Sequence, residues 1–232
     1  MSFSRWPTAV ALSAGLFLAA GAVADTPDAA KKGLQQVGEF VGEWKGAGTV
    51  AGKKSVWKET ISWGWSFKGG EPRLTLTVAD GKFVKAGALA YLPEKKAYRL
   101  TATDPAGTEQ VYDGKLTRGR LVLESKDAAS GDVHRLTLYT VGDGARMLLV
   151  GETQSKGKGL FAKEYEVAAN KVGESFAGGG GKKAECVVTG GLGTIPVSYL
   201  GKTYYVCCSG CRDEFTANPK KYVDEYEKNR KK

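Results

Sequence analysis

Histidine is almost absent from this chain, and several common catalytic motifs are missing altogether. The 232 residues include one histidine, His134, and contain no G-x-S-x-G, phosphate-loop or H-E-x-x-H sequence. The usual constellations of catalytic residues are therefore not present. Glu59 shares the apolar phase of a predicted strand and is interpreted as a satisfied buried polar group, not as a general base. We expect a protein that is not an enzyme.

Charge is absent from a long stretch near the N-terminus. Residues 6–24 follow Arg5, are rich in alanine and end in the small-residue sequence Ala-Val-Ala. A charged start, an apolar middle and an A-x-A exit are typical of a secretory signal peptide, here residues 1–24 with cleavage after Ala24. An uncleaved anchor is the alternative, but small, weakly hydrophobic residues disfavour stable membrane insertion. We expect a periplasmic or secreted protein, in a compartment that permits disulfides.

The overall composition is that of an ordinary globular protein. Hydrophobic residues make up 42% of the chain and charged residues 25%, which predicts a folded protein. The net charge is +9, but the basic residues are spread out apart from the run at 228–232. No aromatic-basic groove pattern accompanies that run, so we expect no nucleic-acid partner.

Apolar and polar residues alternate with a period of two through the middle of the chain. In residues 57–67, Trp57, Ile61, Trp63 and Trp65 share one phase, which predicts a long strand with one apolar face. The same alternation, separated by turn signals, returns at 73–78, 86–92, 97–103, 109–116, 120–125, 132–140, 145–153 and 160–168. About ten antiparallel strands at short spacing predict a mainly β protein with an up-and-down barrel, which removes sheet edges.

A short helix is predicted before the strands, and one phrase after it resembles a known barrel family. Residues 26–41 place apolar side chains at helical spacing behind Pro27. The phrase FVGEWKGAG, residues 40–48, resembles the G-x-W-x-G opening of lipocalin-like barrels, including the haem-binding barrels related to nitrobindin. Trp44 is then expected to plug the barrel's end, while glycines let the first strand bend. This barrel is assigned to residues 26–170.

The sequence does not decide which ligand, if any, the barrel binds. The resemblance implies a haem ligand late in the barrel, but His134 lies mid-strand in phase with Leu136 and Leu138. A lone histidine in that position is interpreted as a packed core or lumen residue and not as a haem ligand. The barrel is expected either to hold a small hydrophobic ligand or to be packed solid.

All the cysteine lies in a short C-terminal module. Residues 171–185 are rich in glycine and lysine and predict a flexible linker. The module at 186–232 is too small to depend on a hydrophobic core alone and needs a metal or disulfides. It contains all four cysteines, Cys186, Cys207, Cys208 and Cys211.

The module resembles the YHS and TRASH family of small metal-binding domains. The matching residues are the knuckle CVVTG at 186–190, the hairpin GKTYY at 201–205, Cys207, Cys211, Phe215 and the PKKY helix at 219–222. The resemblance implies an α+β treble-clef arrangement in which two knuckles present thiolates to one metal ion. It also implies a role in metal trafficking or sensing.

The sequence departs from the four-cysteine pattern of that family at Thr189, which is a poor ligand for a soft metal. Either Cys208 becomes the fourth ligand, or the site holds three sulfurs and an open position. Four thiolates suit Zn(II) and three suit trigonal Cu(I), so the metal stays open between these two ions.

Two other interpretations of the cysteines remain. An even cysteine count in an oxidising compartment also fits two disulfides, with Cys186 bonded to Cys207 or Cys208 and the other bonded to Cys211. In that case the barrel is the functional part, as a carrier of a small ligand or haem. Cys208 and Cys211 also form a C-x-x-C sequence at a helix start, which is a redox pattern. A protein-interaction module on a cell-surface or periplasmic assembly is the third function considered.

Overall fold

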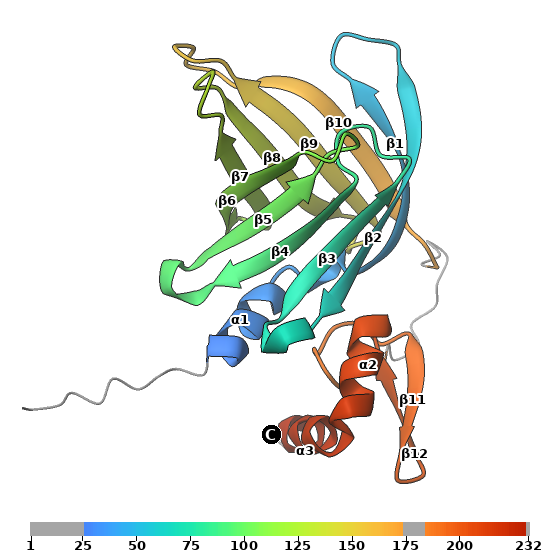
Figure 1. The fold of residues 1–232 in the computed structure, drawn as a ribbon. Coiled ribbons are helices and arrows are strands. Elements are labelled where there is room, and N and C mark those ends of the chain that lie inside the picture. The colour runs from blue at the N-terminus through green and yellow to red at the C-terminus, as the bar shows by residue number, and fades with distance from the viewer. Residues whose placement is uncertain (1–25, 174–183, 231–232) are drawn as a thin grey trace, which may run out of the picture.

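The computed structural model describes residues 26–173 and 184–230. The predicted signal peptide and most of the predicted linker lie outside these ranges. Within them, no helix is both long and apolar enough to cross a bilayer. The chain forms a barrel followed by a small module of two strands and two helices (Figure 1).

Ten antiparallel strands form the barrel, and hydrogen bonding between β1 and β10 closes it. Each strand pairs with the next along the chain, so the predicted up-and-down barrel is confirmed (Figure 1). The strands are β1 (Gly42–Val50), β2 (Val56–Ser66), β3 (Arg73–Ala79), β4 (Ala86–Leu92), β5 (Ala97–Thr103), β6 (Glu109–Thr117), β7 (Arg120–Lys126), β8 (Val133–Val141), β9 (Arg146–Gln154) and β10 (Ala162–Lys171).

The alternating sequence sets which side chains fill the barrel. In β2, Ile61, Trp63 and Trp65 are buried, and the residues between them are half-exposed. The strand bounds differ most from the sequence prediction at β10, which begins at Ala162 because Leu160 is 85% exposed in the preceding hairpin. β10 also runs on to Lys171, the first residue of the predicted linker, because Lys171 pairs with Trp44 of β1.

One end of the barrel is covered by the segment before β1. Helix α1 spans Thr26–Gln35, and a 3-10 turn follows at Gly38–Phe40. The helix ends earlier than the sequence pattern predicted, because the chain turns there to direct Val37 and Phe40 inward. The side chains of Leu34, Val37 and Phe40 are completely buried. The Tyr98 hydroxyl donates a hydrogen bond to the Gly33 carbonyl at 2.8 Å and fixes α1 to the barrel wall.

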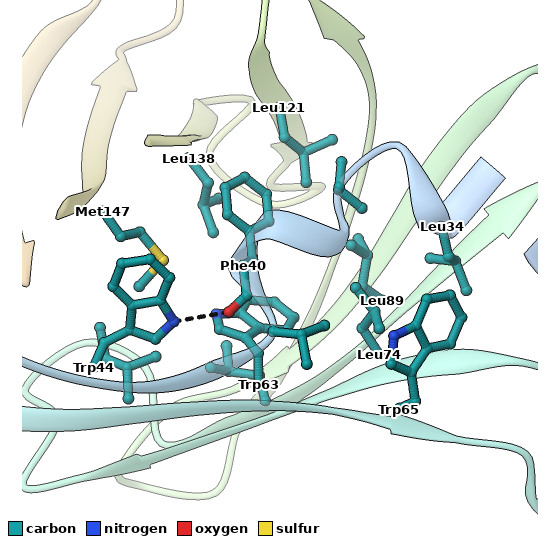
Figure 2. Close-up of a cluster of buried hydrophobic side chains, with 14 of the residues drawn as sticks. Leu34, Phe40, Trp44, Trp63, Trp65, Leu74, Leu89, Leu121, Leu138 and Met147 are labelled. Carbon is teal, nitrogen blue, oxygen red and sulfur yellow. Dashed lines mark hydrogen bonds between the residues drawn. The ribbon is translucent and has the colours of Figure 1, made fainter. Parts of the chain in front are cut away.

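Trp44 closes this end of the barrel, as its position in the sequence predicted. Its indole Nε1 donates a hydrogen bond to the Phe40 carbonyl at 2.8 Å, and its side chain is completely buried (Figure 2). Phe40 in turn contacts Trp63, with ring centroids 6.4 Å apart. The space left among the apolar side chains of the interior is about 20 Å³. That volume holds about one water molecule, so this part of the barrel is packed solid.

The C-terminal module is a hairpin followed by two helices. Strand β11 (Ile195–Tyr199) pairs with β12 (Lys202–Val206), and helices α2 (Ser209–Ala217) and α3 (Pro219–Arg230) follow. Leu200 and Gly201 form the hairpin turn and both have positive φ angles. Asn218 ends α2 and Pro219 begins α3, so the break predicted there is confirmed.

A small aromatic core lies between the hairpin and the helices of the module. Tyr204 contacts both Phe215 and Tyr226, with ring centroids 6.1 Å apart in each pair. Tyr222 is also buried. Tyr205, the next residue of β12, is 39% exposed. It is outside because successive residues of β12 point to opposite faces of the strand.

Replacement of Trp44 by Phe should destabilise the barrel. We expect the free energy of unfolding to fall by about 2 to 4 kcal/mol, because a cavity forms and the buried Phe40 carbonyl loses a hydrogen-bond donor. Urea unfolding monitored by tryptophan fluorescence measures the change. Val111→Ala on β6 is the control, since Val111 is 47% exposed and its replacement should have little effect. Equal stabilities of the Trp44 variant and the control would contradict this role.

Candidate metal centre

The first of two cysteine-bearing turns, the first knuckle, comprises residues 186–191. The Gly190 N–H donates to the Cys186 carbonyl at 2.8 Å, and the Cys186 N–H donates to the Gly191 carbonyl at 2.6 Å. Gly190 has a φ of +73°, a conformation that glycine adopts without a steric penalty. The Val187 N–H bonds the Tyr205 carbonyl at 2.8 Å and fixes the knuckle against the hairpin. Cys186 is thereby held in the interior, with 1% of its surface exposed.

The second knuckle comprises residues 207–211 and joins β12 to α2. Cys207 follows the last residue of β12, Cys208 precedes the first residue of α2, and Cys211 lies in the first turn of that helix. The positive end of a helix dipole favours thiolates, so this position suits a metal ligand. Cys211 is completely buried, whereas Cys207 is half-buried.

Three of the four predicted ligands come together. The Sγ atoms of Cys186, Cys207 and Cys211 all lie within 4.8 Å of one another. The Cys207 and Cys211 Sγ atoms are 3.4 Å apart, and all four cysteines are free thiols. Two sulfurs bound tetrahedrally to one zinc ion at about 2.3 Å are about 3.8 Å apart. The spacing of the cluster is therefore that of sulfurs able to share one metal ion.

Cys208 lies beside the cluster but is not part of this group. Its Sγ atom is 3.9 Å from the Sγ atom of Cys207 and accepts a hydrogen bond from the backbone N–H of Trp65 at 3.3 Å. Thr189, at the position of a missing cysteine ligand, is also close, with its Oγ1 atom 3.6 Å from the Cys207 Sγ atom. The site therefore consists of three grouped sulfur atoms, and the Cys208 sulfur and the Thr189 hydroxyl lie at its edge.

Hydrogen bonds among the thiols lower the pKa of some cysteines and raise the pKa of others. The Cys207 and Cys211 thiols donate toward Cys186 and lower its pKa. The same two groups lower the pKa of Cys208. The pKa of Cys211 is raised, chiefly because its thiol bonds to Cys186. Metal binding requires the ligand thiols to be deprotonated, so a cation entering the cluster would displace their protons.

The module is held against the closed end of the barrel by contacts from both knuckles. The Gln35 side-chain amide donates to the Thr189 carbonyl at 2.7 Å, and Trp65 donates to Cys208. The Lys31 ammonium lies 5.1 Å from the centroid of the Tyr222 ring. Burial is the main cause of a lowered Lys31 pKa, and the nearby Glu225 carboxylate is the largest influence that opposes this shift. The side-by-side placement of α1, the end of β2 and the module is visible in Figure 1.

A cleft leads from the surface to the cluster. It has a volume of about 850 Å³ and is lined by both the barrel end and the first knuckle, including Glu43, Trp65, Thr189 and Cys207. The cleft reaches Cys207, the most exposed of the three grouped cysteines, so a ligand or partner has access to one side of the cluster.

The other candidate position, His134, lies near the far mouth of the barrel. Its Nδ1 atom is 2.8 Å from the Thr153 Oγ1 atom, and it lines a pocket of about 190 Å³ together with Tyr112 and Tyr165. Binding sites for drug-sized ligands usually measure about 300 to 1,000 Å³. The pocket beside His134 is smaller than that range.

Sequence reasoning missed the part that the barrel plays at this site. Gln35 and Trp65 contact the knuckles through one side-chain amide and one backbone N–H. Backbone donors have no sequence signature, and nothing in the sequence relates Trp65 to Cys208. The glycine at position 210 is explained by this contact, because a Cβ atom there would clash with the Trp65 carbonyl oxygen.

Glu59, near the open mouth, gives a pH test of the barrel. Burial raises its pKa above 4.5, although the indole of Trp57 donates to its carboxylate at 2.6 Å. Because the folded-state pKa is raised, Glu59 makes its largest contribution to protein stability below pH 4.5. That contribution is lost as the pH rises through the folded-state pKa. We expect Glu59→Gln to gain stability relative to wild type as pH rises from about 4.5 to 8.

Urea unfolding at each pH measures this difference. Glu109→Gln, at an exposed position on β6, is the control and should show no such trend. A constant difference between wild type and the Glu59 variant across the pH range would contradict the assignment.

No protein-family model matches this chain, and no curated protein matches it either. The resemblance of the module to YHS and TRASH domains therefore remains a prediction from the motif residues. The functional conclusion depends on the geometry of the cysteine cluster.

Proposed function

We propose that this is an exported metal-binding protein that carries one Cu(I) or Zn(II) ion and acts in metal trafficking or sensing. The observation that supports it is the mutual approach of the Cys186, Cys207 and Cys211 sulfur atoms to within 4.8 Å. These atoms come from two turns that are separated by the hairpin β11–β12.

The ligand type favours a soft metal ion. Thiolates bind Cu(I) and Zn(II) strongly, whereas Mg²⁺ and Ca²⁺ prefer oxygen ligands. The nearest oxygen to the cluster among the described hydrogen bonds is the Thr189 hydroxyl, a neutral group and a poor competitor for these metals. The cluster thus excludes hard cations by its chemistry.

The access to the cluster supports exchange of the metal, in addition to a stabilising role. Structural zinc sites are usually closed by four protein ligands. Here three sulfurs form the group, and Cys207 borders the cleft of about 850 Å³. An ion with an open side can be passed to or taken from a partner that supplies a ligand of its own. The signal-like segment at 1–24 supports export, so this exchange would take place outside the cytoplasm.

Metal content and thiol count test the proposal. Protein purified anaerobically should contain about one equivalent of copper or zinc and four free thiols after denaturation without reductant. Cys211→Ser should lose most of the metal, because it removes the buried ligand on α2. Ser209→Ala is the matched control, since Ser209 lies in the same knuckle with an exposed side chain.

Two outcomes would contradict the proposal. Protein without metal and without free thiols would show a module held by two disulfides. In that case an absorption band in the Soret region on adding haemin, lost in His134→Ala, would identify the barrel as a haem carrier instead. Retention of metal by Cys211→Ser at the wild-type level would remove Cys211 from the ligand set.

A further inference from the structure

The backbone hydrogen bonding at the end of β2 is completed by the cysteine module. The pairing of β1 with β2 stops at Gly42 and Trp63, while β2 continues to Ser66. Trp65 therefore lies beyond the last β1 pair, and its backbone N–H donates to the Cys208 sulfur at 3.3 Å. An N–H group that is buried without a partner is costly, so this bond is of value to the barrel as well as to the module.

Gly210 makes the approach possible. A Cβ atom at this position would clash with the carbonyl oxygen of Trp65 and would lie 2.8 Å from its carbonyl carbon. Both are backbone atoms of a closed barrel and cannot move aside easily. Only glycine at position 210 allows the second knuckle to reach the backbone of β2.

The same contact decides where the Cys208 sulfur lies. Its Sγ atom is 3.9 Å from that of Cys207, about the separation of two sulfurs on one ion, yet it lies outside the group of three. To join that group, the Cys208 sulfur would have to move closer to the other sulfurs, and its bond to the Trp65 N–H restrains that movement. Thr189, on the other side of the cluster, is also fixed by the barrel end, because the Gln35 side-chain amide donates to its carbonyl at 2.7 Å.

We propose that docking of the barrel withholds Cys208 from the metal, so that Trp65 and Gly210 set the coordination number at three sulfurs and favour Cu(I) over Zn(II). This inference rests on the proposed metal-binding function. Three thiolates complete the trigonal coordination of Cu(I). Zn(II) in the same site lacks a fourth sulfur and must take water or another oxygen instead. The barrel is then the part of the protein that determines metal choice.

The test compares Cu(I) and Zn(II) affinities in the full-length chain, each measured by competition with a chromophoric chelator under anaerobic, reducing conditions. Gly210→Ala should separate the knuckle from Trp65 and release Cys208 as a fourth ligand. One unsatisfied buried donor corresponds to about a 5- to 150-fold change in an equilibrium constant. We therefore expect Zn(II) affinity relative to Cu(I) to rise by at least about fivefold.

Two further variants make the comparison specific. Cys208→Ser keeps an acceptor for the Trp65 N–H but removes the sulfur, so its Cu(I) affinity should stay within about twofold of wild type. Gly210→Ala combined with Cys208→Ser should lose the gain in Zn(II) affinity. Gly64→Ala is the control for an added methyl group next to Trp65, because its Cβ atom has only an ordinary contact of 3.8 Å with Thr75.

X-ray absorption spectroscopy of the Cu(I)-loaded wild type should show three sulfur neighbours. Four sulfur neighbours, a loss of Cu(I) affinity in Cys208→Ser as large as in Cys211→Ser, or unchanged metal preference in Gly210→Ala would each overturn this inference and leave the proposed function standing. Wild-type protein that binds neither ion would overturn the proposed function itself.

Discussion

The convergence of sulfur atoms from two separate turns is the constraint on which the C-terminal module depends. The aromatic core of the module around Tyr204 and Phe215 is joined by buried valines and is continuous with the hydrophobic core of the barrel. Cys186 and Cys211 are almost completely buried at the junction of the first knuckle, the hairpin and α2. A metal shared by these sulfurs would connect all three elements at one point and add its binding energy to the stability of the module.

The barrel contributes to the same site through its closed end. Trp65 has two roles, because its side chain packs with Leu34, Leu74 and Leu89 inside the barrel while its backbone N–H contacts Cys208 (Figure 2). The ring therefore fixes the strand, and the strand fixes the position of a sulfur beside the cluster. Since Trp44 and Phe40 fill the same end of the barrel, the platform under the module is rigid. If the cluster binds a metal ion as proposed, its binding would be coupled to the packing of the barrel through Trp65.

Much of this arrangement could be predicted because it follows local patterns. The alternation of apolar and polar residues in β2 predicted which face of the strand is buried. The turn signals predicted where each strand ends. The number of strands, and the need to leave no open sheet edge, then predicted the barrel. The sulfur atoms of Cys186, Cys207 and Cys211 are grouped, and their role as metal ligands, like that of Cys208, stays a prediction. Cys208 could not be placed from the sequence, because its sulfur bonds a backbone group 143 positions away. The early end of α1 was likewise set by tertiary packing, which a local pattern does not record.

Hydrogen exchange with and without a chelator of thiophilic metals tests the central claim most directly. The amides of Val187 and Gly190 donate the hydrogen bonds that shape the first knuckle. If a shared ion holds the module together, its removal should abolish protection of these amides and of α2, while amides of β1 to β10 stay protected. Unchanged protection in the module after complete metal removal, with the thiols still reduced, would contradict the account.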